Sequence, residues 1–139
     1  ERDGKVRSFH VATVNTNTLR PILFTQVDRK SYLMTDEASV YKKPGQEFSG
    51  HGRVNHSIEE YVRGGFWHTN TVENYYSILK RGITGIYQHV SPKHLKRYVG
   101  EFDFRYNERS ISDSERAAKA IKGAEGKRLT YQQPRRAQA

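Results

Sequence analysis

The most regular pattern in the chain occupies residues 68–110, which read HTNTVENYYSILKRGITGIYQHVSPKHLKRYVGEFDFRYNERS. Apolar residues recur there at spacings of four, three and four, which predicts a helix over residues 70–81. The apolar stripe of that helix comprises Val72, Tyr76, Leu79 and Ile83. Gly82 and Gly85 follow and are predicted to end the helix.

Two further helices are predicted downstream. One begins at Ser91-Pro92, because serine is a favoured cap and proline suits the first helical position. Its apolar face comprises Leu95, Val99, Phe102 and Tyr106. The other lies within residues 112–122, SDSERAAKAIK, before a polar, basic tail. We therefore expect a folded core in residues 1–109, followed by a basic helix and tail in residues 110–139.

Upstream, residues 31–35, SYLMT, predict a short strand that runs directly into Asp36. Residues 18–27, TLRPILFTQV, predict a helix that Asn17 or Thr18 caps. Pro21 would then fall in its first turn, where the missing N–H does little harm.

Residues 5–14, KVRSFHVATV, are rich in β-branched and aromatic types and predict another strand. Asp3-Gly4 is a hairpin signal, so a partner strand is expected further upstream and the chain is expected to be a fragment. Residues 42–52 indicate a loop, and a short strand is predicted near residues 53–56. This alternation indicates an α/β fold, with residues 6–11 and 32–35 as neighbours in one sheet.

Composition narrows the function classes. The chain has 24 Lys and Arg against 15 Asp and Glu, a net charge of +9, which favours a polyanionic partner such as nucleic acid. The absence of cysteine excludes disulfides and cysteine-ligated zinc, and fits a reducing compartment such as the cytoplasm. No apolar run approaches the roughly 20 residues that span a bilayer, so no membrane partner is expected.

Two acids are candidates for chemistry, and each has a structural alternative. Asp36 follows a strand, where ligands gather in α/β sheets, but it could instead cap a short helix beginning at Glu37. Glu73 follows Asn70 by three residues, which also matches a capping box. Lys80 lies seven residues beyond Glu73, so both point the same way on a helix, about 10 Å apart. A solvated polar face explains that pair equally well.

Other catalytic patterns are weaker. His51, His56 and His68 match no compact zinc spacing, and no cysteine assists them. The hydroxyl residues lack the context of a nucleophile elbow, and no phosphate-binding glycine loop is present.

At residues 68–110 the sequence closely resembles the C-terminal part of the catalytic domain of ISXO-type insertion-sequence transposases. YLMTDEASVY, residues 32–41, resembles the segment around that family's second catalytic acid, and VNHSIEEYVRG, residues 54–64, is also similar. The resemblance implies an RNase H-like mixed sheet flanked by helices, here without its N-terminal strands.

The resemblance also implies a DDE-type triad of metal-binding acids. Asp36 matches the second acid, Glu73 the third, and Lys80 the basic residue that follows. The first acid is expected upstream of Gly4, so the isolated chain is expected to be inactive. Two Mg²⁺ or Mn²⁺ ions would assist in-line displacement at phosphorus, with water and then a freed 3′-hydroxyl as nucleophiles. The alternatives are an RNase H-like nuclease and a non-catalytic, DNA-binding remnant of a transposase.

The expected partners are transposon ends and target DNA, bound by a homo-oligomer. Basic residues after the third acid and in the tail are candidates for phosphate contacts. They are Lys80, Arg81, Lys93, Lys96, Arg97, Arg135 and Arg136.

Overall fold

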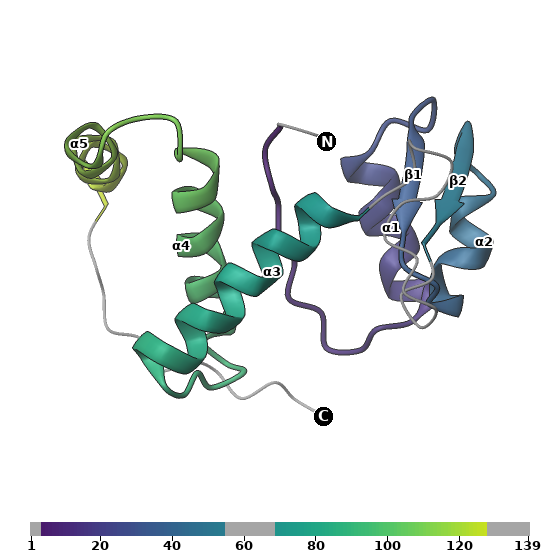
Figure 1. Ribbon diagram of the computed structural model, residues 1–139, viewed down its shortest axis with the longest axis horizontal. Helices are drawn as coiled ribbons and strands as arrows, with labels where there is room; N and C mark the ends of the chain where they lie inside the picture. The colour runs from purple at the N-terminus through teal and green to yellow at the C-terminus, as the bar shows by residue number, and fades with distance from the viewer. Residues whose placement is uncertain (1–3, 55–68, 128–139) are drawn as a thin grey trace. The chain divides into compact units, whose positions relative to one another are not determined.

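The computed structural model describes residues 4–54 and 69–127, and its chain divides into two compact units (Figure 1). Unit 1 consists of Glu1–Phe9 and Leu79–Ala139, and unit 2 consists of His10–Ile78. Helices and strands are both present, which confirms the predicted mixed α/β content. In the described ranges, no helix has the length and apolar character that spanning a bilayer requires.

Unit 2 begins with helix α1, Thr16–Gln26. Its N-cap is Asn15, whose extended backbone lets the side chain accept a hydrogen bond from the Thr18 amide at 2.9 Å. The predicted cap at Asn17 or Thr18 was therefore wrong by two or three positions. Because α1 starts earlier than expected, Pro21 lies inside the helix rather than in its first turn.

The sheet of unit 2 has two parallel strands, β1 (Tyr32–Thr35) and β2 (Gly50–Arg53), lying side by side in Figure 1. Their register pairs Tyr32 with Gly50 and Thr35 with Arg53. Parallel strands need a crossover of a dozen or more residues. The crossover contains a 3₁₀ turn, η1 (Ser39–Tyr41), and a short helix, α2 (Lys42–Gly45).

The strand at residues 32–35 is thus confirmed, whereas the predictions for the next segment were wrong. Residues 42–52 contain α2 and most of β2 instead of a loop, and β2 ends at Arg53 where a strand was predicted to begin. The sequence of β2, GHGR, has little strand propensity. Pairing with β1 therefore decides its conformation. Residues 55 and 56 of the predicted strand lie outside the described residues.

A small apolar core holds unit 2 together. Leu33, Phe48 and Val54 are buried, and the ring of Phe48 lies 5.9 Å from that of Phe24 on α1. Each such side chain contributes roughly 1.5–3 kcal/mol on full burial. Tyr75 of the long helix is also buried, with 2% of its surface exposed.

That long helix, α3, spans Asn70–Gly82, close to the predicted range. Its buried face contains Tyr75 and Leu79, whereas Val72 and Tyr76 are exposed. The predicted apolar stripe was therefore wrong at two of its four positions. The buried face uses Tyr75 where the sequence predicted Tyr76. Two adjacent tyrosines make either helix face apolar, so the spacing alone does not choose between them.

In unit 1, α3 continues into a wider π-helical turn, η3 (Ile83–Tyr87), which leads toward α4 (Leu95–Asn107). The predicted start at Ser91 is instead a turn, and regular helix begins at Leu95. Val99 and Phe102 are buried as predicted. The Tyr87 hydroxyl donates to Glu101 Oε2 at 2.6 Å and its ring packs edge-on against Tyr98, which fixes η3 against α4.

Residues 5–11 do not form the predicted strand, and β1 pairs with β2 instead of with this segment. The segment is nevertheless tied to α4. The Val6 amide donates to Asn107 Oδ1 at 2.7 Å, and Asn107 Nδ2 donates to the Val6 carbonyl at 3.0 Å. Two residues later, the Ser8 amide donates to Asp103 Oδ2 at 2.8 Å. Asp103 and Asn107, which lie one helical turn apart on α4, thus bind the backbone of this segment where a neighbouring strand was predicted.

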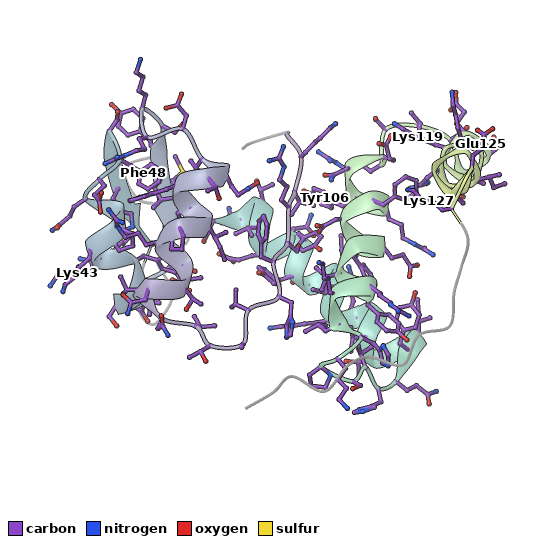
Figure 2. All side chains as sticks on the ribbon, turned by 180° about the vertical axis from the view of Figure 1, so that it is seen from behind. Lys43, Phe48, Tyr106, Lys119, Glu125 and Lys127 are labelled. Atoms are coloured by element: carbon purple, nitrogen blue, oxygen red, sulfur yellow. The ribbon has the colours of Figure 1, made fainter. Side chains whose placement is uncertain are left out.

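The last described helix, α5 (Asp113–Ala124), confirms the prediction for residues 112–122. Ser112 caps it through a capping box with Glu115. Lys119 reaches from α5 to Glu108, with Nζ and Oε2 2.6 Å apart (Figure 2). Because none of its residues is buried, α5 depends on its cap and on such pairs more than on core packing.

Candidate functional site

Asp36 directly follows β1, at the carboxyl end of the parallel strand pair, as the sequence predicted. Its side chain is exposed, and Oδ1 accepts a hydrogen bond from the Ala38 amide at 3.2 Å. The N-cap of the following turn η1 is Ala38, so Asp36 closes an Asx-type turn and does not cap a helix. Among the described residues, it takes part in no ion pair.

The backbone at Asp36 is held by neighbours from both strands. Thr35 Oγ1 donates to the Asp36 carbonyl at 2.8 Å and lies 2.9 Å from His51 Nε2. The single hydrogen of the Thr35 hydroxyl is used in the bond to the Asp36 carbonyl, so in its contact with His51 the hydroxyl accepts and His51 Nε2 donates. Burial lowers the pKa of His51, and the nearby Arg53 lowers it further. The imidazole is consequently a neutral donor that stabilises the end of β1.

Gly45 makes room for that imidazole. A β-carbon at position 45 would come within 2.1 Å of His51 Nδ1, so any larger residue would displace the ring. Sequence reasoning considered His51 only as a zinc ligand and missed this role. Gly45 and His51 belong to separate elements, α2 and β2. Their contact depends on the pairing of β1 with β2, so the sequence alone does not indicate it.

Tyr41 also lies near Asp36. Burial raises the pKa of the Tyr41 hydroxyl, and the Asp36 carboxylate and the Tyr76 phenol raise that pKa further. The Tyr41 hydroxyl therefore stays protonated and is a potential donor to an anionic ligand. Tyr76 belongs to α3, three residues beyond Glu73, so Tyr41 is influenced both by the residue that follows β1 and by α3.

Glu73 lies in the first turn of α3 and is half-buried. Its carboxylate accepts a hydrogen bond from the Thr69 hydroxyl, and its amide donates to the Thr69 carbonyl at 3.0 Å. The helix begins at Asn70, whereas a capping box would place Asn70 before the first helical residue. The contact with Thr69 fixes the orientation of Glu73 and was not predicted.

The carboxylates of Asp36 and Glu73 offer the hard oxygen ligands that Mg²⁺ prefers. They fit the ion chemically as two ligands of a larger set. Within the ranges that the structure describes, no group of three or more His, Asp or Glu is placed to hold a metal. His56 and His68 of the zinc hypothesis lie outside those ranges.

The candidate DNA contacts within the described residues all belong to unit 1 and are exposed. They are Lys80, Arg81, Lys93, Lys96 and Arg97. Lys80 follows Glu73 on the same helix, as predicted. Arg135 and Arg136 lie beyond the described part of the chain.

Comparison with known proteins identifies a family that the chain resembles. No curated protein and no solved structure is detectably similar to the chain. A family model described as the ISXO2-like transposase domain matches residues 1–107. The match includes β1 with Asp36, the whole of α3, and α4. Because it spans well over half of the 139 residues, the chain belongs to the ISXO2-like transposase domain family.

Proposed function

We propose that this chain is part of the catalytic domain of a DNA transposase that cleaves transposon ends and joins them to target DNA. The observation that carries the proposal is Asp36, an exposed carboxylate at the carboxyl end of a parallel strand pair in a member of a transposase family. Ligands of α/β sheets gather at that edge. An RNase H-like fold for the complete domain and a DDE triad are part of the same proposal.

In this proposal Asp36 and Glu73 are the second and third acids and bind Mg²⁺ or Mn²⁺. When bound, two such ions stabilise the attacking and leaving oxygens of in-line displacement at phosphorus. The turn at Ala38 holds one oxygen of Asp36, and the Thr69 hydroxyl orients Glu73. A third acid is required and is not assigned to a described residue. In the same proposal the Tyr41 hydroxyl, whose pKa is raised by burial and by the Asp36 carboxylate, would remain protonated near the bound ions.

The test is end cleavage and strand transfer by the natural full-length protein. A labelled duplex carrying the transposon end is incubated with Mg²⁺ or Mn²⁺. Asp36→Asn and Glu73→Gln preserve the size of each side chain and its ability to accept a hydrogen bond, but they remove its charge. Each variant should lose both reactions while keeping wild-type stability. If either variant cleaved the transposon end at the rate of the wild-type protein, that acid would be assigned wrongly.

Asp28 provides the matched control. Asp28 Oδ1 accepts from the Lys30 amide at 2.9 Å, which is the same two-residue turn bond that Asp36 makes with Ala38. Asp28→Asn should therefore leave both reactions unchanged. Cleavage without joining would favour the RNase H-like nuclease. Metal-independent DNA binding without cleavage would favour a non-catalytic remnant.

A further inference from the structure

The direction of the Asp36 side chain depends on the two peptide planes on either side of its Cα atom. A peptide unit is planar, so the backbone of one residue has only two soft dihedral angles. Fixing both neighbouring planes therefore fixes the direction in which the β-carbon of Asp36 leaves the backbone. Each of these two planes is held by a hydrogen bond within unit 2.

The plane before Asp36 is held by the residue that directly follows β2. The Val54 amide donates to the Thr35 carbonyl at 3.0 Å, one residue beyond the ladder that pairs Thr35 with Arg53. Val54 is completely buried, with 0% of its surface exposed. The backbone on the N-terminal side of Asp36 is therefore attached to the core of unit 2.

The plane after Asp36 is held by a side chain. Thr35 Oγ1 donates to the Asp36 carbonyl at 2.8 Å, and Thr35 is buried, with 8% of its surface exposed. His51 Nε2 lies 2.9 Å from the same Thr35 oxygen. A hydroxyl has one hydrogen, so the bond that it accepts from His51 leaves that hydrogen for the Asp36 carbonyl. The two hydrogen bonds therefore support one another.

The carboxylate itself is restrained at one of its two oxygens. Asp36 Oδ1 accepts from the Ala38 amide at 3.2 Å, whereas within the described ranges Oδ2 accepts no hydrogen bond. Gly45 contributes from a third element, because a β-carbon at that position would displace the His51 ring. Asp36 thus has a fixed backbone, one oxygen held by its turn and one oxygen available to a ligand.

We propose that Thr35 and His51 are positioning residues for Asp36: they set the direction of its carboxylate and thereby the affinity of the site for a divalent cation. The proposal rests on the proposed function for the role of Asp36 as a metal ligand, whereas the hydrogen bonds themselves do not depend on that function. Thr35 and His51 act through the backbone of Asp36 and do not contact the cation.

The expected size of the effect follows from the way in which these bonds act. Residues that orient metal-binding side chains typically change metal affinity roughly 10- to 100-fold. The bond from Thr35 reaches the backbone of Asp36 and not its carboxylate. We therefore expect a change of about tenfold, at the lower end of that range.

The experiment measures binding of Mn²⁺ to the natural full-length protein without DNA, from the electron paramagnetic resonance signal of the free ion. Thr35→Val removes the hydroxyl and keeps the β-branched shape, and His51→Leu removes the donor to that hydroxyl. Each should raise the Kd for Mn²⁺ about tenfold. Thr35→Ser keeps a hydroxyl and His51→Gln keeps a donor, so both should bind Mn²⁺ with the wild-type Kd.

Thr25→Val is the matched control. Thr25 Oγ1 donates to the Pro21 carbonyl at 2.9 Å in α1, so this variant also loses a bond from threonine to a carbonyl within unit 2. Its Kd for Mn²⁺ should equal that of the wild type. A tenfold increase in this control as well would overturn the proposal, because the effect would not be specific to the end of β1.

Urea denaturation separates positioning from stability. If Thr35→Val lowers the free energy of unfolding but the folded variant binds Mn²⁺ as the wild type does, Thr35 is only structural and the proposal is wrong. If Thr35→Val does not fold, the comparison of His51→Leu with His51→Gln decides, because both leave β1 unchanged. Equal Mn²⁺ affinities in those two variants would also overturn the proposal.

Asp36→Asn distinguishes failure of this proposal from failure of the catalytic one. If Asp36→Asn weakens Mn²⁺ binding while Thr35→Val and His51→Leu do not, the metal site stands and the positioning role fails. If all three weaken binding and the wild-type protein never cleaves a transposon end, the catalytic function fails while the positioning role stands. Wild-type Mn²⁺ affinity in Asp36→Asn would refute both.

Discussion

Gly82 lies so close to Phe102 that a β-carbon at position 82 would come within 2.1 Å of the ring carbon Cζ. Gly82→Ala should destabilise the protein by about 1–3 kcal/mol, because the buried ring must move or α3 must separate from α4. Chemical denaturation measures the loss. Gly100→Ala is the control, since a β-carbon there meets nothing within 4 Å, and alanine in α4 should stabilise by up to about 1 kcal/mol. Equal effects at both sites would contradict the close packing.

Asn107 should be needed to hold the segment around Val6. Asn107→Ala removes an acceptor for the Val6 amide and a donor to the Val6 carbonyl, so we expect a loss of about 1–3 kcal/mol. Hydrogen exchange at the Val6 amide should accelerate in the variant. Asn74→Ala, at an exposed position of α3, should leave that exchange rate unchanged. Unchanged exchange in Asn107→Ala would show that the segment is held in another way.

His51 should make stability depend on pH. Its pKa in the folded protein is below the ordinary value of 6.5, so as pH falls the unfolded chain takes up the proton first. The free energy of unfolding should therefore decrease as pH falls from about 6.5 toward the lowered pKa. His51→Gln keeps a donor for Thr35 but does not titrate, so its stability should fall less over that window. The comparison is urea denaturation from pH 7.5 to 5, with His10→Gln as the control. Parallel curves for wild type and His51→Gln would refute this role.

The capping box of α5 should determine how much of that helix forms. Ser112→Ala removes the side chain that accepts from the Glu115 amide and donates to its carboxylate. Helical content measured by circular dichroism should fall, whereas Ser110→Ala should leave it unchanged. The hydrogen bond from Ser112 lowers the pKa of Glu115, so its stabilising effect is present near neutral pH and is lost as pH falls through that lowered pKa. Equal helicity in the two serine variants would contradict the prediction.

Local patterns predicted the elements whose neighbours lie close in sequence. The strand that ends before Asp36 and the buried pair Val99 and Phe102 followed from apolar spacing. The pattern could not choose between Tyr75 and Tyr76, because adjacent aromatic residues support two helix faces equally. Tertiary packing selects Tyr75.

Features that depend on distant partners could not be predicted. β2 has little intrinsic strand preference and forms through its ladder with β1. The Val6 segment has strand-like composition, yet its partners are side chains of α4. At the candidate site, sequence placed Asp36 correctly at the strand end, but the Thr35–His51 bond joins residues 16 positions apart across the sheet. No spacing rule indicates such a bond. The roles of Asp36 and Glu73 in catalysis remain predictions.

The bonds from Val6 and Ser8 to α4 join residues 101 and 95 positions apart, with the whole of unit 2 between them. Unit 2 is therefore an insertion within unit 1, and the two units differ in when they can be completed during synthesis. Unit 2 is formed by one continuous segment, so it can fold as soon as that segment has been synthesised. The contact between Val6 and Asn107 can form only after Asn107 has left the ribosome. Closing a flexible loop of that length is entropically costly, and prior folding of unit 2 removes most of its freedom. We expect unit 2 to fold first and the contacts of Val6 and Ser8 with α4 to form as the last step.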